Sequence, residues 1–187
     1  MRPQKVLDNE ILDGLSQVFR SKGYDGASLK DLSGATGLKK ASLYHRFPSG
    51  KKEMADAVLH HIQNWVEEQV FFELLNEENS PSLRLKKGLN EIRVLYNGGK
   101  EICIFRALSL QSGLELFANE INTGMQKWIS TFETLGLSFG LAPTEAKNEA
   151  TKTLIKIQGS LIVSKGLDNI EVFENALQEI ETTYSNS

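Results

Sequence analysis

The segment from Ala27 to Met54, ASLKDLSGATGLKKASLYHRFPSGKKEM, constrains the fold more than any other part of the chain. Ser28 followed three residues later by Asp31 is typical of a helix start, because the hydroxyl and the carboxylate can satisfy free backbone N–H groups there. Gly37 marks a tight reversal that favours positive φ. The segment therefore predicts two short helices joined by a glycine turn, followed by the start of a third helix near Lys51.

Apolar residues in this segment recur at helical spacing, which predicts the side that faces a core. The expected core residues are Leu29, Leu32, Ala35, Leu38, Leu43 and Phe47. Pro48 ends the second helix, 41–47, because it cannot continue the backbone hydrogen bonding. The layout is that of a helix-turn-helix, and the outward side of its second helix carries Lys39, Lys40, Ser42, Tyr44, His45 and Arg46.

The charge of this outward side indicates an anionic partner. Between Asp31 and Glu53 the chain has five basic residues and no acidic residue. Two of them, Lys51 and Lys52, lie in a helix's first turn, where a cation opposes the helix dipole unless an anion is bound. A DNA phosphate backbone would supply that anion, although an ordinary helical hairpin with a solvated basic face has the same composition.

The spacing of the whole segment resembles the DNA-binding domain of the TetR family of bacterial transcription regulators. The resemblance lies in the capped helix from Ser28 to Leu38, in Leu43-Tyr44-His45-Arg46-Phe47-Pro48, and in Ser49-Gly50-Lys51. Two positions differ from the family pattern: Lys39 replaces a Ser or Thr cap, and Arg46 replaces an aromatic residue. The resemblance implies a homodimeric regulator, most often a repressor, that binds a double-stranded DNA operator and responds to a small-molecule inducer.

We assign the DNA contacts from the outward side of the segment. Lys40, Tyr44 and His45 are predicted to contact bases, and Ser42, Lys51 and Lys52 to contact phosphates. Ser28, Lys39 and Arg46 complete the predicted DNA-binding set. Arg2 and Lys5, near the N-terminus, are further groups that could reach DNA.

The rest of the chain predicts further helices. One begins at Pro3 and ends at Gly23, and a long one runs from Lys51 to about Leu75 without Pro or Gly. Later apolar stripes predict helices over 81–96, 114–135 and 143–161, and Asp168 with Glu171 predicts a capping box before the last helix. The segment 102–108 predicts a short buried helix, with a strand as the alternative. We expect an all-α fold of about nine helices, with a DNA-binding domain at 1–50 and a ligand-binding and dimerisation domain at 51–187.

Two residue sets are predicted in the second domain. Apolar stripes that a monomer would leave partly exposed predict a dimer interface, with a small residue allowing close approach of helices. This set is Leu154, Ile157, Gly159, Leu161, Phe173, Leu177 and Ile180. A ligand pocket is predicted from aromatic residues and the single cysteine, although an aromatic stripe equally fits a core: Trp65, Cys103, Phe105, Trp128 and Phe132.

Composition and motifs limit the other classes of function. Residues 1–60 hold ten Lys or Arg against seven Asp or Glu, and the remainder holds eleven against seventeen, so positive charge is concentrated in the N-terminal part. One cysteine excludes an internal disulfide, and no apolar run is long enough for a membrane helix, which predicts a cytoplasmic protein. No nucleophile motif, phosphate loop or metal-ligand spacing is present; His60 and His61 are adjacent and point apart on a helix. The sequence predicts neither enzyme activity nor a cofactor, and leaves a helical protein-interaction module as the alternative.

Overall fold

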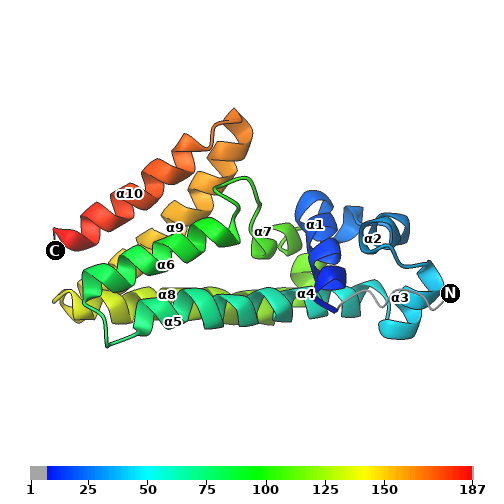
Figure 1. Cartoon of the computed structure of the whole chain (residues 1–187), viewed down its shortest axis with the longest axis horizontal. Coiled ribbons are helices and arrows are strands. Elements are labelled where there is room, and N and C mark those ends of the chain that lie inside the picture. Colours follow the sequence, from blue (N-terminus) through cyan, green and yellow to red (C-terminus); the bar gives the residue numbers. More distant parts are fainter. Residues whose placement is uncertain (1–7, 187) are drawn as a thin grey trace. The chain divides into compact units, whose positions relative to one another are not determined.

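Helices and the turns between them account for residues 8–186, the part of the chain that this computed structural model describes (Figure 1). No strand occurs among these residues. They form nine helices when the continuous helical stretch Lys51–Leu75 is counted once, as predicted. The predicted helix start at Pro3, and the groups Arg2 and Lys5, lie outside the described residues.

The chain divides into two units, and the division differs from the expected boundary after residue 50. The first unit comprises the residues up to Gln63 together with Ile104–Ile121, and the second comprises Asn64–Cys103 and Asn122–Ser187. Two helical stretches, Lys51–Leu75 and Ser112–Ser138, continue from one unit into the other. A short segment distant in sequence therefore belongs to the same unit as the N-terminal helices.

The first unit is built from α1 (Asp8–Gly26), α2 (Leu29–Thr36), α3 (Lys40–Arg46), most of α4 (Lys51–Trp65), α7 (Ile104–Leu108) and the start of α8 (Ser112–Ser138). Gly23 has φ of 69° inside α1, so the regular helix ends there as predicted. Its core contains Ile11, Leu15, Phe19, Leu32, Leu43 and Met54, each fully buried. The segment around α7 is a buried helix that packs on α1, which excludes the strand alternative.

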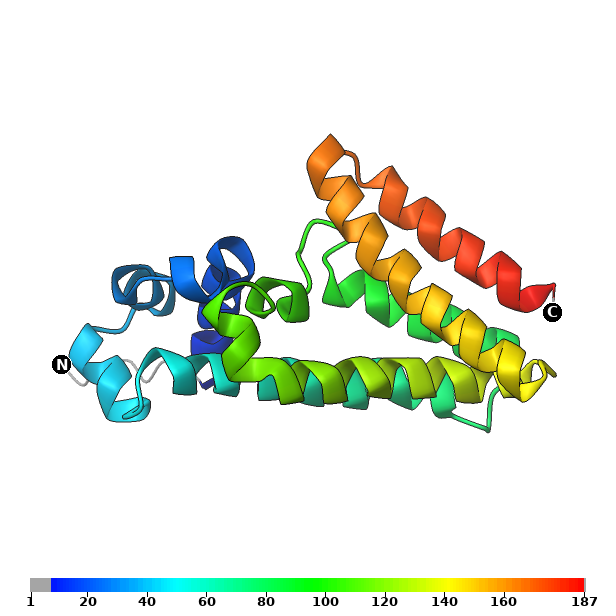
Figure 2. The same cartoon turned by 180° about the vertical axis from the view of Figure 1, so that it is seen from behind.

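The second unit contains η1 (Val66–Phe71), α5 (Phe72–Leu75), α6 (Pro81–Leu95), the rest of α8, α9 (Pro143–Leu167) and α10 (Glu171–Ser185). Helices α9 and α10 lie side by side, and α10 also packs on α6 (Figure 2). Arg84 is buried on α6, where its Nε donates to the Leu74 carbonyl oxygen at 2.7 Å and its Nη1 to Ser138 Oγ at 3.1 Å. This cation therefore binds the last turns of both α5 and α8, where the helix dipoles favour positive charge.

Several local predictions are wrong for identifiable reasons. The apolar stripe of the long helix predicted from Lys51 to about Leu75 includes Phe72. The π-helical turn η1 adds residues to each turn, so that Phe71 is buried instead and Phe72 is 60% exposed. Asp168 does not cap α10, because it ends α9 in the left-handed conformation; Asn169 Oδ1 accepts from the Glu171 N–H instead. Gly113, which we expected to end the short helix predicted over 102–108, lies in the first turn of α8. Three other stripe residues are exposed: Ala35, Leu114 and Ile170.

Candidate nucleic-acid interface

The start of α2 is fixed by a capping box, as predicted. Ser28 Oγ accepts from the Asp31 N–H at 3.2 Å, and Asp31 Oδ2 accepts from the Ser28 N–H at 3.1 Å. Lys22 Nζ donates to the same carboxylate at 2.6 Å. The hydrogen bond from Lys22, together with those from Ser28, lowers the pKa of Asp31 to about 2. The carboxylate therefore stays ionised, and it joins the end of α1 to the start of α2.

The turn between α2 and α3 requires glycine at one position and uses a buried threonine at another. Gly37 ends α2 with φ of 67°, in the left-handed region that an L side chain rarely adopts. Thr36 is buried, and its Oγ1 donates to the Leu32 carbonyl oxygen at 2.8 Å. This geometry reverses the chain within a few residues and sets the direction of α3.

Helix α3 has one buried side and one exposed side, as predicted. Leu43 and Phe47 are buried and anchor the helix in the first unit. Lys39 is the N-cap residue and its side chain makes no capping hydrogen bond. The exposed side carries all six side chains that were expected to face outward: Lys39, Lys40, Ser42, Tyr44, His45 and Arg46.

Tyr44 lies against the turn that leads into α4. A Cβ added to Gly50 would lie 3.4 Å from Tyr44 Cε1, and Gly50 itself has φ of 75°. Gly50 is therefore required by its backbone conformation, and the tyrosine ring lies at contact distance from this turn. The ring is held by this turn while 45% of the residue stays exposed to solvent.

The two lysines at the start of α4 have partners within the protein. Lys51 Nζ donates to the carbonyl oxygens of Tyr24 at 2.8 Å and Ala27 at 3.3 Å, and it lies 4.5 Å from the centre of the Tyr24 ring. Lys52 Nζ binds Asp56 Oδ2 at 2.8 Å. Lys51 and Lys52 therefore do not require an external anion, contrary to our expectation, because protein oxygens already compensate their charges.

Arg46, in the last turn of α3, also has a partner within the protein. Its Nη2 forms an ion pair with Asp8 Oδ1 in the first turn of α1. Neither Lys39 nor Lys40 forms an ion pair with another described residue. Of the five basic residues in this segment, the two without a protein partner in the described structure thus lie together at the N-terminal end of α3.

The residues predicted for the dimer interface are placed differently from the expectation. Six of them are at most 8% exposed because they pack within the second unit of the same chain: Leu154, Ile157, Leu161, Phe173, Leu177 and Ile180. The prediction that a monomer leaves these stripes partly exposed is therefore wrong. Gly159 differs from them, since a Cβ added there would meet no atom within 4 Å.

Two of the aromatic residues predicted for a ligand pocket, Trp128 and Phe132, pack on each other and on further rings. Trp128 contacts Phe71 edge-on at 5.1 Å between ring centres and stacks on Phe132 at 6.2 Å. Phe132 in turn contacts Tyr184, whose burial raises its pKa to about 12. Cys103 and Phe105 are buried, and Trp65 is half-buried. The two aromatics of α8 therefore belong to a packed aromatic row.

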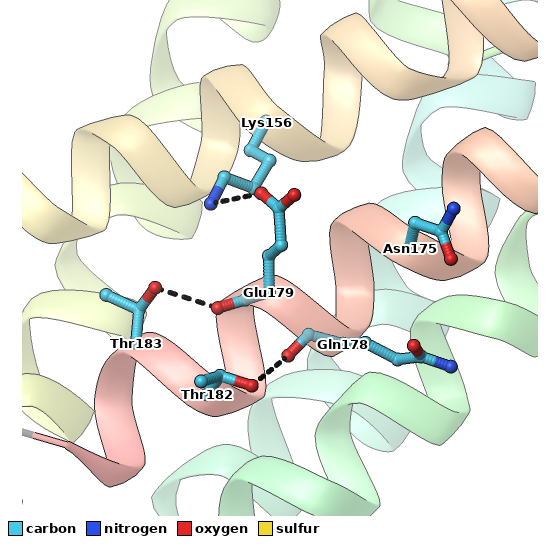
Figure 3. Close-up of a pocket in the computed structure, with 6 residues that line it drawn as sticks. All are labelled: Lys156, Asn175, Gln178, Glu179, Thr182 and Thr183. Atoms are coloured by element: carbon cyan, nitrogen blue, oxygen red, sulfur yellow. Dashed lines mark hydrogen bonds and ion pairs between the residues drawn. The ribbon is translucent and has the colours of Figure 1, made fainter.

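The grooves on the second unit include two with different linings. The groove between α9 and α10, of about 480 Å³, is lined by polar and charged residues, including the Lys156–Glu179 ion pair at 3.1 Å (Figure 3). The other, of about 530 Å³, lies beside η1 and is mainly apolar; it is lined by Glu67, Phe71, Phe72, Leu75, Asn76 and Lys127. The sequence did not predict the second groove, because its shape depends on the π-helical turn.

Metal-binding clusters and membrane-spanning helices are both absent from residues 8–186. No group of three His, Cys, Asp or Glu residues in this range is arranged to hold a metal ion. No helix in the same range is both long and apolar enough to span a membrane.

The first unit has the architecture of a helix-turn-helix DNA-binding protein. Residues 11–58 match the family of bacterial regulatory proteins described as the tetR family. This match, together with the relatives and solved structures described next, supports a DNA-binding transcriptional regulator of the TetR family. The regulators of this family are not enzymes.

Similarity to relatives extends over most of the chain but is low. An uncharacterised HTH-type transcriptional regulator from Lactococcus lactis is 24% identical over 182 residues, covering 94% of this chain and 91% of that protein. The negative regulator IcaR of the Staphylococcus aureus biofilm operon is 42% identical over 45 residues, covering 24% of each chain.

Two solved structures share the fold. A TetR regulator from Legionella pneumophila has a TM-score of 0.81 at 19% identity, covering 98% of this chain and 99% of that chain. The regulator CifR, in a cysteine mutant complexed with a 26-bp operator duplex, has a TM-score of 0.74 at 22% identity, covering 95% and 98%.

Proposed function

We propose that this regulator is a homodimeric repressor that binds a pseudo-palindromic operator and is released by a small molecule. The observation that carries the proposal is the exposed side of α3, where Lys39 and Lys40 have no ion-pair partner among the described residues. The name of the S. aureus relative, a negative regulator, supports repression. The operator complex of CifR supports double-stranded DNA as the partner. A bacterial regulator of this kind would act in the cytoplasm, where the chromosome lies.

We assign Lys40, Tyr44 and His45 to base contacts, because they project from the exposed side of α3. Lys39 and Ser42 are assigned to phosphates. Two recognition helices related by a two-fold axis would read half-sites about 34–36 Å apart, one turn of DNA. Ser28, Lys51 and Lys52 would act mainly by holding the helices in place, since their side chains already have protein partners.

The outer side of α9 is the surface we propose for dimerisation. Ile155, Ile162 and Leu167 are 66%, 50% and 66% exposed, and Gly159 and Gly166 lie on the same side with open space beyond them. Ile155, Gly159, Ile162 and Gly166 follow the i, i+4, i+7, i+11 spacing of one helix face. An exposed apolar stripe of this kind is typical of an interaction surface, and the glycines would allow a partner helix to approach closely.

The small molecule is proposed to bind the second unit. Trp128 and Phe132 stack on each other, so a ligand between them would have to separate two packed rings. The groove beside η1 is already open and mainly apolar, as sites for drug-sized molecules usually are. The polar groove between α9 and α10 has no such lining.

Gel-shift titration of the purified protein with a random-sequence duplex, at several salt concentrations, tests the DNA-binding part of the proposal. Affinity should fall steeply with salt, because phosphate contacts release counterions. The absence of a salt-dependent shift would contradict DNA binding and favour a protein-interaction module.

A thermal-shift screen of metabolites and drugs, followed by operator titration with each hit, tests whether a small molecule releases the protein from its operator. A regulator that binds its operator equally with and without every hit would be a constitutive DNA binder.

A further inference from the structure

The ion pair between Asp8 and Arg46 joins two helix ends in the first unit. Asp8 lies in the first turn of α1 and Arg46 in the last turn of α3. A carboxylate is favourable at a helix N-terminus and a guanidinium at a C-terminus, so each group also suits the dipole of its own helix. Arg46, which replaces an aromatic residue of the family pattern, thus places a cation at the end of α3. Asp8 of α1 supplies the matching anion.

An acidic side chain at this place has an electrostatic consequence for DNA binding. The Asp8 side chain is 73% exposed, and that of Arg46, in the last turn of α3, is 37% exposed. A carboxylate beside a DNA-contacting helix repels phosphates. While paired, it also keeps the guanidinium from neutralising a phosphate, which removes one contact that carries no sequence information.

We propose that Asp8 masks the charge of Arg46 and so weakens binding to DNA of any sequence, to a random duplex and to the operator alike. This inference rests on the proposed DNA-reading role of α3. The base-contacting side chains assigned above, Lys40, Tyr44 and His45, have no carboxylate partner among the described residues, so the masking is confined to Arg46.

Asp8→Asn tests the proposal, because it retains the shape of the side chain and removes its charge. Exposed ion pairs contribute little to folding, so the variant should keep the parent's fold. Its affinity for a random duplex should rise, and the slope of log affinity against log salt should steepen by about 0.9, the value for one further phosphate. The affinity for the operator should rise by a similar factor, so the ratio of operator to random affinity should stay near the parent value.

Two further variants separate masking from a general charge effect. Asp13→Asn makes the same charge change on α1, but Asp13 faces His61 at 3.3 Å instead of Arg46, so its salt slope should stay at the parent value. Arg46→Gln in the Asp8→Asn background should abolish the gain in affinity for the random duplex. The operator duplex is first selected from a random library by the parent protein.

Three outcomes would overturn the proposal: equal slopes for Asp8→Asn and the parent, an equal rise for Asp13→Asn, or a gain that persists without Arg46. Loss of operator affinity in Asp8→Asn with unchanged random binding would also overturn it, since Asp8 would then orient Arg46 toward a base. Each of these results leaves the parent a DNA-binding protein. If instead the parent binds no duplex, the proposed function itself fails.

Discussion

Lys51 Nζ lies 2.8 Å from the carbonyl oxygen of Tyr24 and 4.5 Å from the centre of the same residue's ring. One ammonium thus contacts both the backbone and the side chain of a residue 27 positions earlier. Tyr24 in turn stacks on Phe19 and contacts Phe117 edge-on. The start of α4 is therefore fastened to the end of α1 and to α8 within the first unit.

Lys51→Met should destabilise the protein by about 2 kcal/mol, because it removes two hydrogen bonds from a charged donor and a cation–π contact. Equilibrium urea denaturation measures the change. Lys40→Met is the matched control: Lys40 is exposed and has no ion-pair partner among the described residues, so its stability should stay within about 0.5 kcal/mol of the parent. Equal midpoints for Lys51→Met and Lys40→Met would show that the Lys51 contacts contribute nothing.

Replacing two glycines of the first unit by alanine should change the stability of the protein in opposite directions. A Cβ at Gly14 on α1 would lie 2.6 Å from the Ala35 carbonyl oxygen, whereas a Cβ at Gly34 on α2 would meet nothing within 4 Å. Gly14→Ala should therefore destabilise by roughly 1–3 kcal/mol, since two backbones must separate. Gly34→Ala should stabilise by about 0.5–1 kcal/mol, because alanine favours a helix more than glycine. Thermal unfolding of both variants beside the parent measures the two effects, and shifts of the same sign would contradict the α1–α2 packing.

The same contact explains one limit of sequence reasoning. Ala35 was expected to face the core from its spacing after Leu29 and Leu32, but its backbone carbonyl takes that place, because Gly14 lets the backbone approach. Spacing gives the side of a helix, and it does not say how close the neighbouring backbone comes. The capping box at Ser28 and the turn at Gly37 were predictable because each depends only on residues nearby in sequence.

Longer-range features were not predictable for a different reason. The partners of Lys51 and Arg46 are distant in sequence and meet them only in the folded unit. The π-helical turn at η1 changes the register of a stripe that looks continuous in the sequence. Both sides of α9 carry apolar residues, so the sequence could not say which side packs inside the chain and which side is left for a partner.

The depressed pKa of Asp31 predicts a loss of stability in acid. Its folded pKa of about 2 lies below the ordinary value of 3.8, so the contribution is fully present above about pH 5 and is lost as pH falls from about 4 towards 2. Asp31→Asn should be less stable than the parent at pH 7, and this difference should shrink at pH 3. Urea denaturation at both values measures it, with Asp25→Asn as a control on the same unit. A difference that is equal at both pH values would show that the capping carboxylate does not titrate with folding.

The exposed side of α9 gives the last prediction, which concerns assembly. Ile162→Glu places a charge on the outer side of the helix, where the residue is 50% exposed, so the monomer should fold as before while a dimer formed through this surface should dissociate. Ile157→Ala truncates a residue of the same helix that is fully buried in the chain, so it should lower stability by about 2–4 kcal/mol and leave the dimer in place. Gly159→Arg should act like Ile162→Glu, because it fills the open space beside the helix. Light scattering at micromolar concentration measures the mass, and urea denaturation measures stability. A dimeric Ile162→Glu variant would place the interface on another surface, and a monomeric parent would remove the two-fold arrangement on which the predicted half-site spacing depends.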